Sequence, residues 1–144
     1  MAQHSDEESN WIPPDVDLDR PSVARIYDYM LGGHHNFEVD RRAGDGLAAL
    51  FPDLELAAQV NRAFLRRAAS FVSQQGIDQY LDLGSGIPTV GNVHEIVRRY
   101  VPDARVVYVD IEPVAVAHAD VMLSDDPGAT AILADVRRPN DILD

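Results

Sequence analysis

Three short apolar segments, separated by stretches long enough for a helix, constrain this chain more than any other feature of its sequence. We expect these segments to be β-strands, over residues 80–83, 105–110 and 130–134. Apolar periodicity predicts helices between them, over residues 92–100 and 113–123. Strands that alternate with helices are typical of a parallel sheet whose strands are joined by crossover helices. We therefore predict an α/β, Rossmann-like fold.

The residues before the first strand have a different character. Residues 1–20 are predicted to be a disordered acidic leader, because they are rich in carboxylates and contain Pro13-Pro14. Residues 21–76 are expected to form a helical cap, with helices that begin near residue 21, near 39 and near 54. Residues 77–144 then form the Rossmann-like, cofactor-binding half, which we expect to be incomplete at its C-terminal end.

The third predicted helix carries a regular apolar stripe. Its members recur at helical spacing and are Val60, Phe64, Ala68, Phe71 and Val72. A stripe of this kind on one face predicts packing into the core. We therefore expect the two phenylalanines to be buried, rather than to form an aromatic platform for nucleic-acid bases.

Charge and composition exclude several classes of partner and chemistry. The 144 residues carry 24 acids and 12 bases, for a net charge of −12, and every base is an arginine. A net acidic surface repels phosphate backbones, so no nucleic-acid partner is expected. The absence of lysine excludes a P-loop or a Schiff base, and the absence of cysteine excludes disulfides and zinc–thiolate sites.

Short segments of the sequence bear on the cellular location of the protein and on metal binding. No apolar run is long enough to cross a bilayer, and residues 1–6 lack the features of a secretory signal, so a cytoplasmic location is expected. His34 and His35 are adjacent, which is poor spacing for two ligands of one ion, and we interpret them as part of a polar turn. No metal site is predicted.

The ends of the three predicted strands carry the chemistry. In a parallel sheet, ligands bind outside the carboxyl ends of the strands. There the sequence places Gly84 and Gly86, whose missing side chains permit a sharp turn and a close approach of a ligand, and then Asp110 and Asp135. Asp110 lies 24 residues after Gly86, near the spacing at which an acid binds ribose hydroxyls. Alternatively, the glycines form an ordinary turn and Asp110 caps the next helix.

The loop itself distinguishes between nucleoside ligands. A dinucleotide site requires a third glycine for the pyrophosphate, and here Pro88 follows Gly86 instead. Asp82 lies two residues before the first glycine, where its carboxylate would oppose a pyrophosphate. It favours a ligand with a cationic amino group, such as the methionyl amine of S-adenosylmethionine.

Several motifs resemble one protein family. Residues 81–86, 109–111 and 134–136 resemble the first three motifs of class I S-adenosylmethionine-dependent methyltransferases. The stretch Ser22–Gly33, with Asn36-Phe37 and Asp40-Arg41, is similar to the bacterial S-adenosyl methyltransferase family formerly catalogued as a domain of unknown function. The resemblance covers nearly all of the chain from Pro21 onward. It implies an enzyme that transfers a methyl group from S-adenosylmethionine to an acceptor.

The resemblance also implies roles for individual residues in holding the cofactor. The methionyl end would contact the first motif, at Asp82, Gly84, Ser85 and Gly86. Asp110 would accept hydrogen bonds from the ribose hydroxyls, and Ile111 would pack on the adenine ring.

The remaining implied contacts come from the third motif and the cap. Asp135 would accept from the exocyclic amine of adenine, and Val136 would supply a backbone N–H to the ring. Tyr29 and Asn36, on the first helix and the turn after it, would belong to a lid over the cofactor. No catalytic residue is assigned, because the sulfonium of the cofactor is already activated and the protein needs chiefly to align the reactants.

Two other functions stay open at this point. The chain could be a non-catalytic module that binds a nucleoside ligand or another protein, or, less favoured by its loop, a nicotinamide-dependent oxidoreductase.

Class I methyltransferases have a larger sheet with the first strand near its centre. The first strand would therefore have an open edge here, through which the chain could associate with itself. For any methyltransferase activity, the sequence does not identify the methyl acceptor.

Overall fold

The three predicted strands form one parallel sheet. The computed structural model describes residues 16–88 and 91–143, and its strands are β1 (Gln79–Leu83), β2 (Arg105–Asp110) and β3 (Ala129–Leu133). They lie in the order β1-β2-β3, with both pairs parallel. The crossover helices are α4 (Val93–Val97) and α5 (Pro113–Met122), and a short α6 (Asn140–Leu143) follows β3. The predicted α/β, Rossmann-like fold is therefore confirmed.

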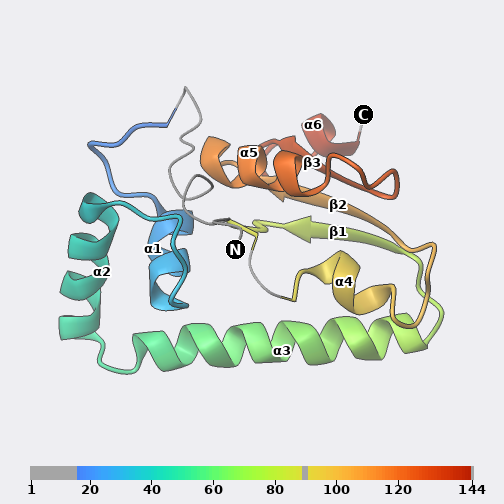
Figure 1. The fold of residues 1–144 in the computed structure, drawn as a ribbon, viewed down its shortest axis with the longest axis horizontal. Coiled ribbons are helices and arrows are strands. Elements are labelled where there is room, and N and C mark those ends of the chain that lie inside the picture. The colour runs from blue at the N-terminus through green and yellow to red at the C-terminus, as the bar shows by residue number, and fades with distance from the viewer. Residues whose placement is uncertain (1–15, 89–90, 144) are drawn as a thin grey trace, which may run out of the picture.

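Three helices precede the sheet in the chain, and two of them stand at one end of it. They are α1 (Val23–Met30), α2 (Glu38–Leu50) and α3 (Leu54–Gln74). Figure 1 shows α3 running the whole length of the molecule, while α1 and α2 stand at the end toward which the strand arrows point. Helices α1 and α2 are thus placed at the carboxyl ends of the strands. Within the described residues, no helix has both the length and the apolar character needed to cross a membrane.

The main core lies between one face of the sheet and the helices α3, α4 and α5. Side chains from every one of these elements meet there, among them Ala69, Ile96, Val97, Val106, Tyr108, Ala119 and Leu123. Since Ala69 of α3 belongs to this cluster, the predicted cap and the predicted Rossmann-like half share one core. The boundary at residue 76 therefore stays a prediction.

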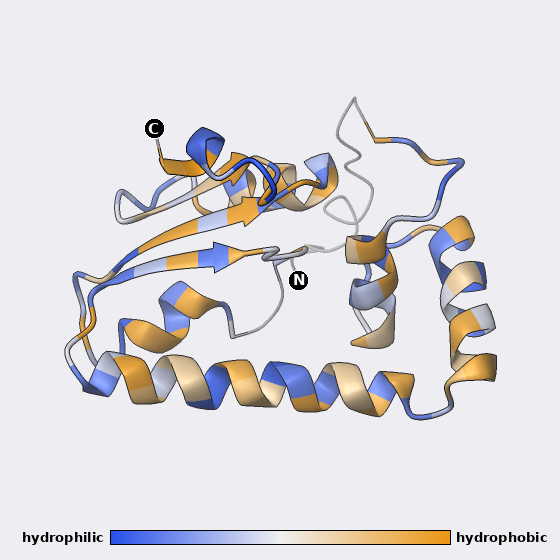
Figure 2. Ribbon diagram, turned by 180° about the vertical axis from the view of Figure 1, so that it is seen from behind, coloured by the Kyte–Doolittle hydropathy of each residue, from blue (hydrophilic) through white to orange (hydrophobic). Residues whose placement is uncertain are grey.

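The apolar stripe predicted to bury α3 is exposed instead. Phe64 and Phe71 are 61% and 66% exposed, and Val60 is 55% exposed. The buried residues of α3 are Ala58, Ala69 and Ser73, on a different face of the helix. Hydrophobic residues recur along the whole of α3 in Figure 2, so periodicity alone marks more than one apolar face. The face of α3 that carries small residues is the buried one, because small side chains let α4 approach α3 closely.

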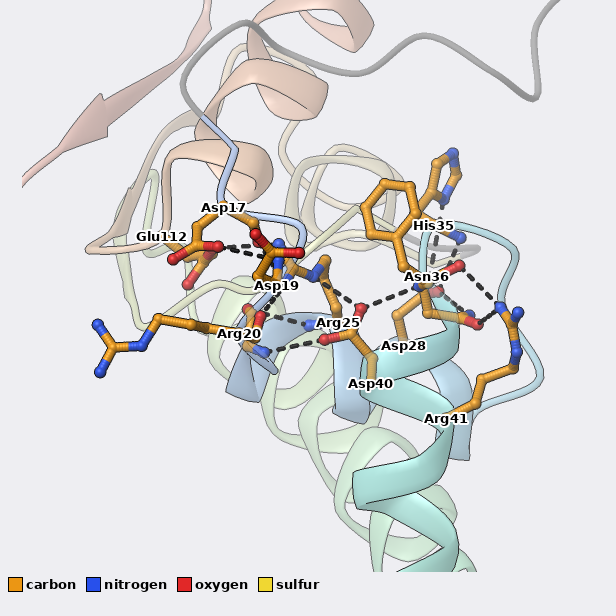
Figure 3. Close-up of polar contacts among 12 residues, drawn as sticks. Asp17, Asp19, Arg20, Arg25, Asp28, His35, Asn36, Asp40, Arg41 and Glu112 are labelled. Atoms are coloured by element: carbon orange, nitrogen blue, oxygen red, sulfur yellow. Dashed lines mark hydrogen bonds and ion pairs between the residues drawn. The ribbon is translucent and has the colours of Figure 1, made fainter.

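A buried ion pair fixes the cap. Arg25 and Asp40 are 1% and 0% exposed, and Arg25 Nε donates to Asp40 Oδ2 at 2.8 Å (Figure 3). The other hydrogen bonds of the Asp40 carboxylate come from backbone N–H groups, those of Ser22 and Phe37. These two residues are the N-caps of α1 and α2. One carboxylate therefore holds the beginnings of both helices.

Arg25 also connects the cap to the strand ends. Its Nη2 donates to the backbone carbonyls of Asp17 and Arg20, at 3.1 and 2.5 Å, and its Nη1 lies 4.0 Å from Glu112 Oε1 in the loop after β2. Of the predicted leader, residues 1–15 lie outside the described residues. Residues 16–20 form no helix or strand, but Arg25 binds their backbone.

We predict that breaking this pair destabilises the whole protein. Arg25→Met leaves the Asp40 charge buried without its partner, which should lower the free energy of unfolding by about 3–5 kcal/mol. The matched control is Arg42→Met, because Arg42 and Glu38 pair with both side chains about three-quarters exposed. It should cost at most about 0.5 kcal/mol. Urea denaturation of both variants measures the difference, and equal losses would contradict the assigned role.

The first strand has an open edge, as the sequence predicts. Within the described residues β1 pairs only with β2, and Leu81 and Leu83 are 51% and 55% exposed. Unpaired backbone groups beside exposed apolar side chains favour pairing with another chain.

We predict that the 144-residue chain associates with itself through β1. Leu81→Lys should shift it toward the monomer, because a charged side chain on an edge strand opposes pairing. Leu50→Lys is the control, since Leu50 is 73% exposed on α2, far along the chain from the sheet. Sedimentation velocity over a range of concentrations measures association. A wild-type chain that remains monomeric throughout would refute this prediction.

Candidate functional site

A two-glycine loop folds back from β1 onto the end of β2. Gly84 and Gly86 have φ angles of 72° and 69°, in the left-handed region that glycine adopts without strain. The N–H groups of Gly84 and Ser85 both donate to the carbonyl of Val109, at 2.8 and 3.1 Å. The loop is thereby held over the carboxyl edge of the sheet, where ligands of parallel sheets bind.

Asp110, the last residue of β2, is bonded to this loop. Its Oδ2 accepts from the N–H of Gly86 at 2.7 Å, and its Oδ1 accepts from the N–H of Glu112 at 2.9 Å. The N-cap of α5 is Glu112, so Asp110 binds the cap residue without being the cap itself. A carboxylate has about four lone-pair positions. With two N–H groups bound, the Asp110 carboxylate keeps capacity to accept from hydroxyl groups.

Asp82 supplies a second carboxylate, one strand away. It pairs in register with Tyr108 on β2. Burial raises the pKa of the Asp82 carboxyl above its ordinary value, and by smaller amounts the Arg62 guanidinium lowers this pKa and the Asp110 charge raises it. The ionised form of Asp82 is therefore disfavoured in the folded protein without a ligand. A ligand that brought a positive charge would relieve this cost.

The third strand end presents another acid beside exposed apolar side chains. The N–H of Ala134 donates to the carbonyl of Asp110, so the ends of β2 and β3 are adjacent. Asp135 accepts from the backbone and the guanidinium of Arg137, and these bonds lower the pKa of its carboxyl to about 2. Ile111 and Val136 follow β2 and β3 and are 60% and 52% exposed. The edge of the sheet thus combines hydrogen-bond acceptors with an apolar surface.

The two residues predicted for a lid lie in the cap. The Tyr29 hydroxyl donates to Asp45 of α2 at 2.8 Å, and its ring lies so close to Gly44 that a Cβ there would be 2.8 Å away. Tyr29 therefore contributes to the packing of α1 against α2. Asn36 Nδ2 donates to Asp28 Oδ2 and to the carbonyl of Gly33, at 2.9 Å each, and so stabilises the turn after α1. Their role toward a cofactor stays a prediction.

Sequence reasoning missed a buried acid under this turn. Asp28 is 2% exposed, and its Oδ2 also accepts from the N–H of His35 at 2.9 Å. Gly33 permits this arrangement, because a Cβ at Gly33 would lie 2.0 Å from Asp28 Oδ1. The available signal was an acid within the apolar pattern of the first predicted helix, next to Tyr27. The histidine pair is part of the same turn, and the His35 ring lies 4.3 Å from that of His118 on α5.

The chain matches the family model described as "S-adenosyl methyltransferase" over residues 9–144. It is similar to the crystal structure of a "putative methyltransferase" from Thermobifida fusca YX, with 47% identity and a TM-score of 0.89, over 93% of this chain and 51% of that one. It is also similar to a "duf574 family protein" from Streptomyces avermitilis MA-4680, with 37% identity and a TM-score of 0.83, over 88% of this chain and 50% of that one. The chain spans about half the length of these two structures. A comparison with curated proteins gives no match.

The raised pKa of Asp82 predicts that this residue weakens the fold. Its pKa is higher in the folded than in the unfolded chain, so ionisation costs folding free energy once the pH rises above the ordinary value of 3.8. Asp82→Asn should therefore raise the melting temperature at neutral pH and lose this advantage well below the ordinary pKa. Thermal denaturation at both pH values measures it, with Asp120→Asn on the exposed face of α5 as control. A lower melting temperature for Asp82→Asn at neutral pH would show that the ionised carboxylate stabilises the fold.

Proposed function

The chain belongs to the S-adenosyl methyltransferase family, and from that premise we propose that it binds S-adenosylmethionine at the carboxyl ends of β1, β2 and β3 as part of a methyltransferase. Membership confirms the resemblance that the motifs predicted. Because the chain spans about half of its solved relatives, cofactor binding is the part of the activity that its own residues can be expected to perform.

The contact between Asp110 and Gly86 carries this proposal. It brings the only acid of β2 to the glycine loop, at the position where nucleotide-binding sheets accept a ribose diol. A carboxylate suits a diol because it can accept from both hydroxyl groups. In this interpretation Asp110 accepts from the ribose, and its bonds to the N–H groups of Gly86 and Glu112 hold it in place.

The other groups at this edge fit the same cofactor. The exposed side chains of Ile111 and Val136 offer an apolar surface for the adenine ring, and Asp135 offers an acceptor for the exocyclic amine. Asp82 is better suited to an ammonium group than to a pyrophosphate. Burial disfavours its ionised form more than the Arg62 guanidinium favours it, and a positive charge on the ligand would stabilise that form. This preference argues against a dinucleotide and hence against nicotinamide-dependent redox chemistry.

The contribution of the protein itself is to position the reactants. When bound, S-adenosylmethionine supplies a methyl group on an already activated sulfonium. The strand-end acids orient the nucleoside, the two-glycine loop approaches it without side chains in the way, and the helical cap restricts access of water. No residue of the chain is assigned as a catalytic base, and the acceptor is not identified by these contacts.

Calorimetric titration of the protein with S-adenosylhomocysteine, S-adenosylmethionine and NAD tests the proposal. We expect heats of binding for the first two ligands and none for NAD. Binding of NAD alone would overturn the proposal and favour an oxidoreductase.

We predict that Asp110→Ala weakens S-adenosylhomocysteine binding by about tenfold or more, because each hydrogen bond to a charged group contributes about 1.5–3 kcal/mol. The variant also leaves the N–H groups of Gly86 and Glu112 without their acceptor, so circular dichroism must establish that it is folded. Asp120→Ala, at an exposed position of α5, should bind like the wild type. Unchanged affinity in folded Asp110→Ala would restrict Asp110 to stabilising the loop.

A further inference from the structure

Four large apolar side chains of α3 face away from the core and are exposed. They are Leu56, Val60, Phe64 and Phe71, and each is between 55% and 66% exposed. Their spacing puts them on one face of the helix, opposite the buried Ala69. Both views show α3 along one side of the molecule, with the sheet and the other helices on the opposite side of it (Figure 1 and Figure 2). Among the described residues, no element covers this face, which we call the outer stripe.

We propose that the outer stripe is the interface of a symmetric dimer, in which α3 of one chain lies antiparallel to α3 of a second copy. This inference is independent of the proposed function, because it uses neither the strand ends nor the glycine loop. It also accounts for an apolar periodicity on α3 that the core of a single chain does not use.

The size of the outer stripe is that of an interaction surface. A phenylalanine presents about 200 Å², so Phe64 and Phe71 alone expose about 250 Å² between them. Contiguous apolar patches larger than a few hundred Å² are rare on monomers and mark interaction sites. The stripe extends over about 24 Å of helix. A contact over that length, with the polar side chains on both sides of it, approaches the roughly 800 Å² per partner of a stable interface.

The distribution of charge on α3 favours a second copy over a charged partner. Glu55, Arg62 and Arg66 lie on the other side of the helix from the outer stripe, by their spacing. Among the charged residues of α3, Arg67 alone lies within the stripe. A strongly charged partner would therefore find little to pair with. An apolar surface of the same kind is the better complement.

Antiparallel packing makes the outer stripe complementary to itself. With a two-fold axis near the middle of the stripe, Val60 faces the partner's Phe71, and Phe64 faces the partner's Arg67, because these two pairs share one midpoint in the sequence. Each contact then occurs twice, as a two-fold interface requires. A guanidinium over an aromatic ring is a favourable contact, and in this register Arg67 does not meet its own copy.

Sedimentation velocity of variants tests the proposal. All of them carry Leu81→Lys, which removes association through the edge of β1, and this background should be a dimer. Adding Phe71→Glu should weaken the dimer at least about a hundredfold, because each dimer loses two central aromatic contacts and buries two carboxylates instead. Phe64→Arg is a second variant, which places like charges opposite each other at Arg67. Circular dichroism establishes that both are folded.

The matched control is Val121→Glu in the same background. Val121 is 63% exposed on α5, so the substitution introduces the same charge at an equally exposed apolar position. It should leave the dimer unchanged.

Cross-linking locates the contact independently of these variants. The chain has no cysteine, so a single introduced cysteine reports on one position. In the Leu81→Lys background, a short bis-maleimide should link Ala68→Cys, beside the middle of the outer stripe, into a covalent dimer. Ser124→Cys, exposed after α5, should stay monomeric.

Two results would overturn the proposal. One is a Leu81→Lys chain that sediments as a monomer at every concentration. The other is a dimer that neither stripe variant weakens and that Ala68→Cys does not link, because the second copy would then bind elsewhere.

Discussion

The ion pair between Arg25 and Asp40 is the interaction on which the arrangement of this protein depends. Burying two charges is costly unless they are paired and their remaining hydrogen-bonding groups are satisfied. Here the Asp40 carboxylate also accepts from the N–H groups of Ser22 and Phe37, while Arg25 donates to the carbonyls of Asp17 and Arg20. The start of α1, the start of α2 and the segment before them are thereby joined at one point. That point lies beside the loop after β2, which is why the cap stands at the carboxyl ends of the strands.

The site follows from what this placement brings together. The sheet contributes acids at successive strand ends, and the glycine loop is bonded to the central one, Asp110. The cap contributes the opposite charge, from Arg62 and Arg66 on α3, together with the buried Asp28. An apolar surface and three acids thus follow one another along the edge of the sheet, and the cavity between the turn after α1 and α3 is lined by two arginines. In the proposed function, the surface and the acids at the strand ends face the adenine ring, the ribose and the methionyl end of S-adenosylmethionine.

The sequence predicted the sheet well because its signals are local. Residues 105–110 are rich in β-branched side chains and form β2 with the predicted bounds, and the positive φ angles of Gly84 and Gly86 are the conformation that the predicted turn requires. The prediction of which face of α3 is buried was wrong because the apolar residues of this helix are spread around it. Only contact with α4 determines which of them are buried. Asp28 and the partners of Arg25 were not found as a site, because the groups that surround them come from segments distant in the chain. A single charged residue in a helical pattern does not reveal whether tertiary structure buries it.

The central claim is that S-adenosylmethionine binds across the carboxyl ends of β1, β2 and β3. A crystal structure of the protein with S-adenosylhomocysteine tests it most directly. We predict hydrogen bonds from the ribose hydroxyls to the Asp110 carboxylate, with the adenine ring against Ile111 and Val136 and the methionyl end beside the loop of Gly84 and Gly86. An adenosyl group bound away from Asp110, or a ligand bound away from the carboxyl ends of the strands, would contradict the account.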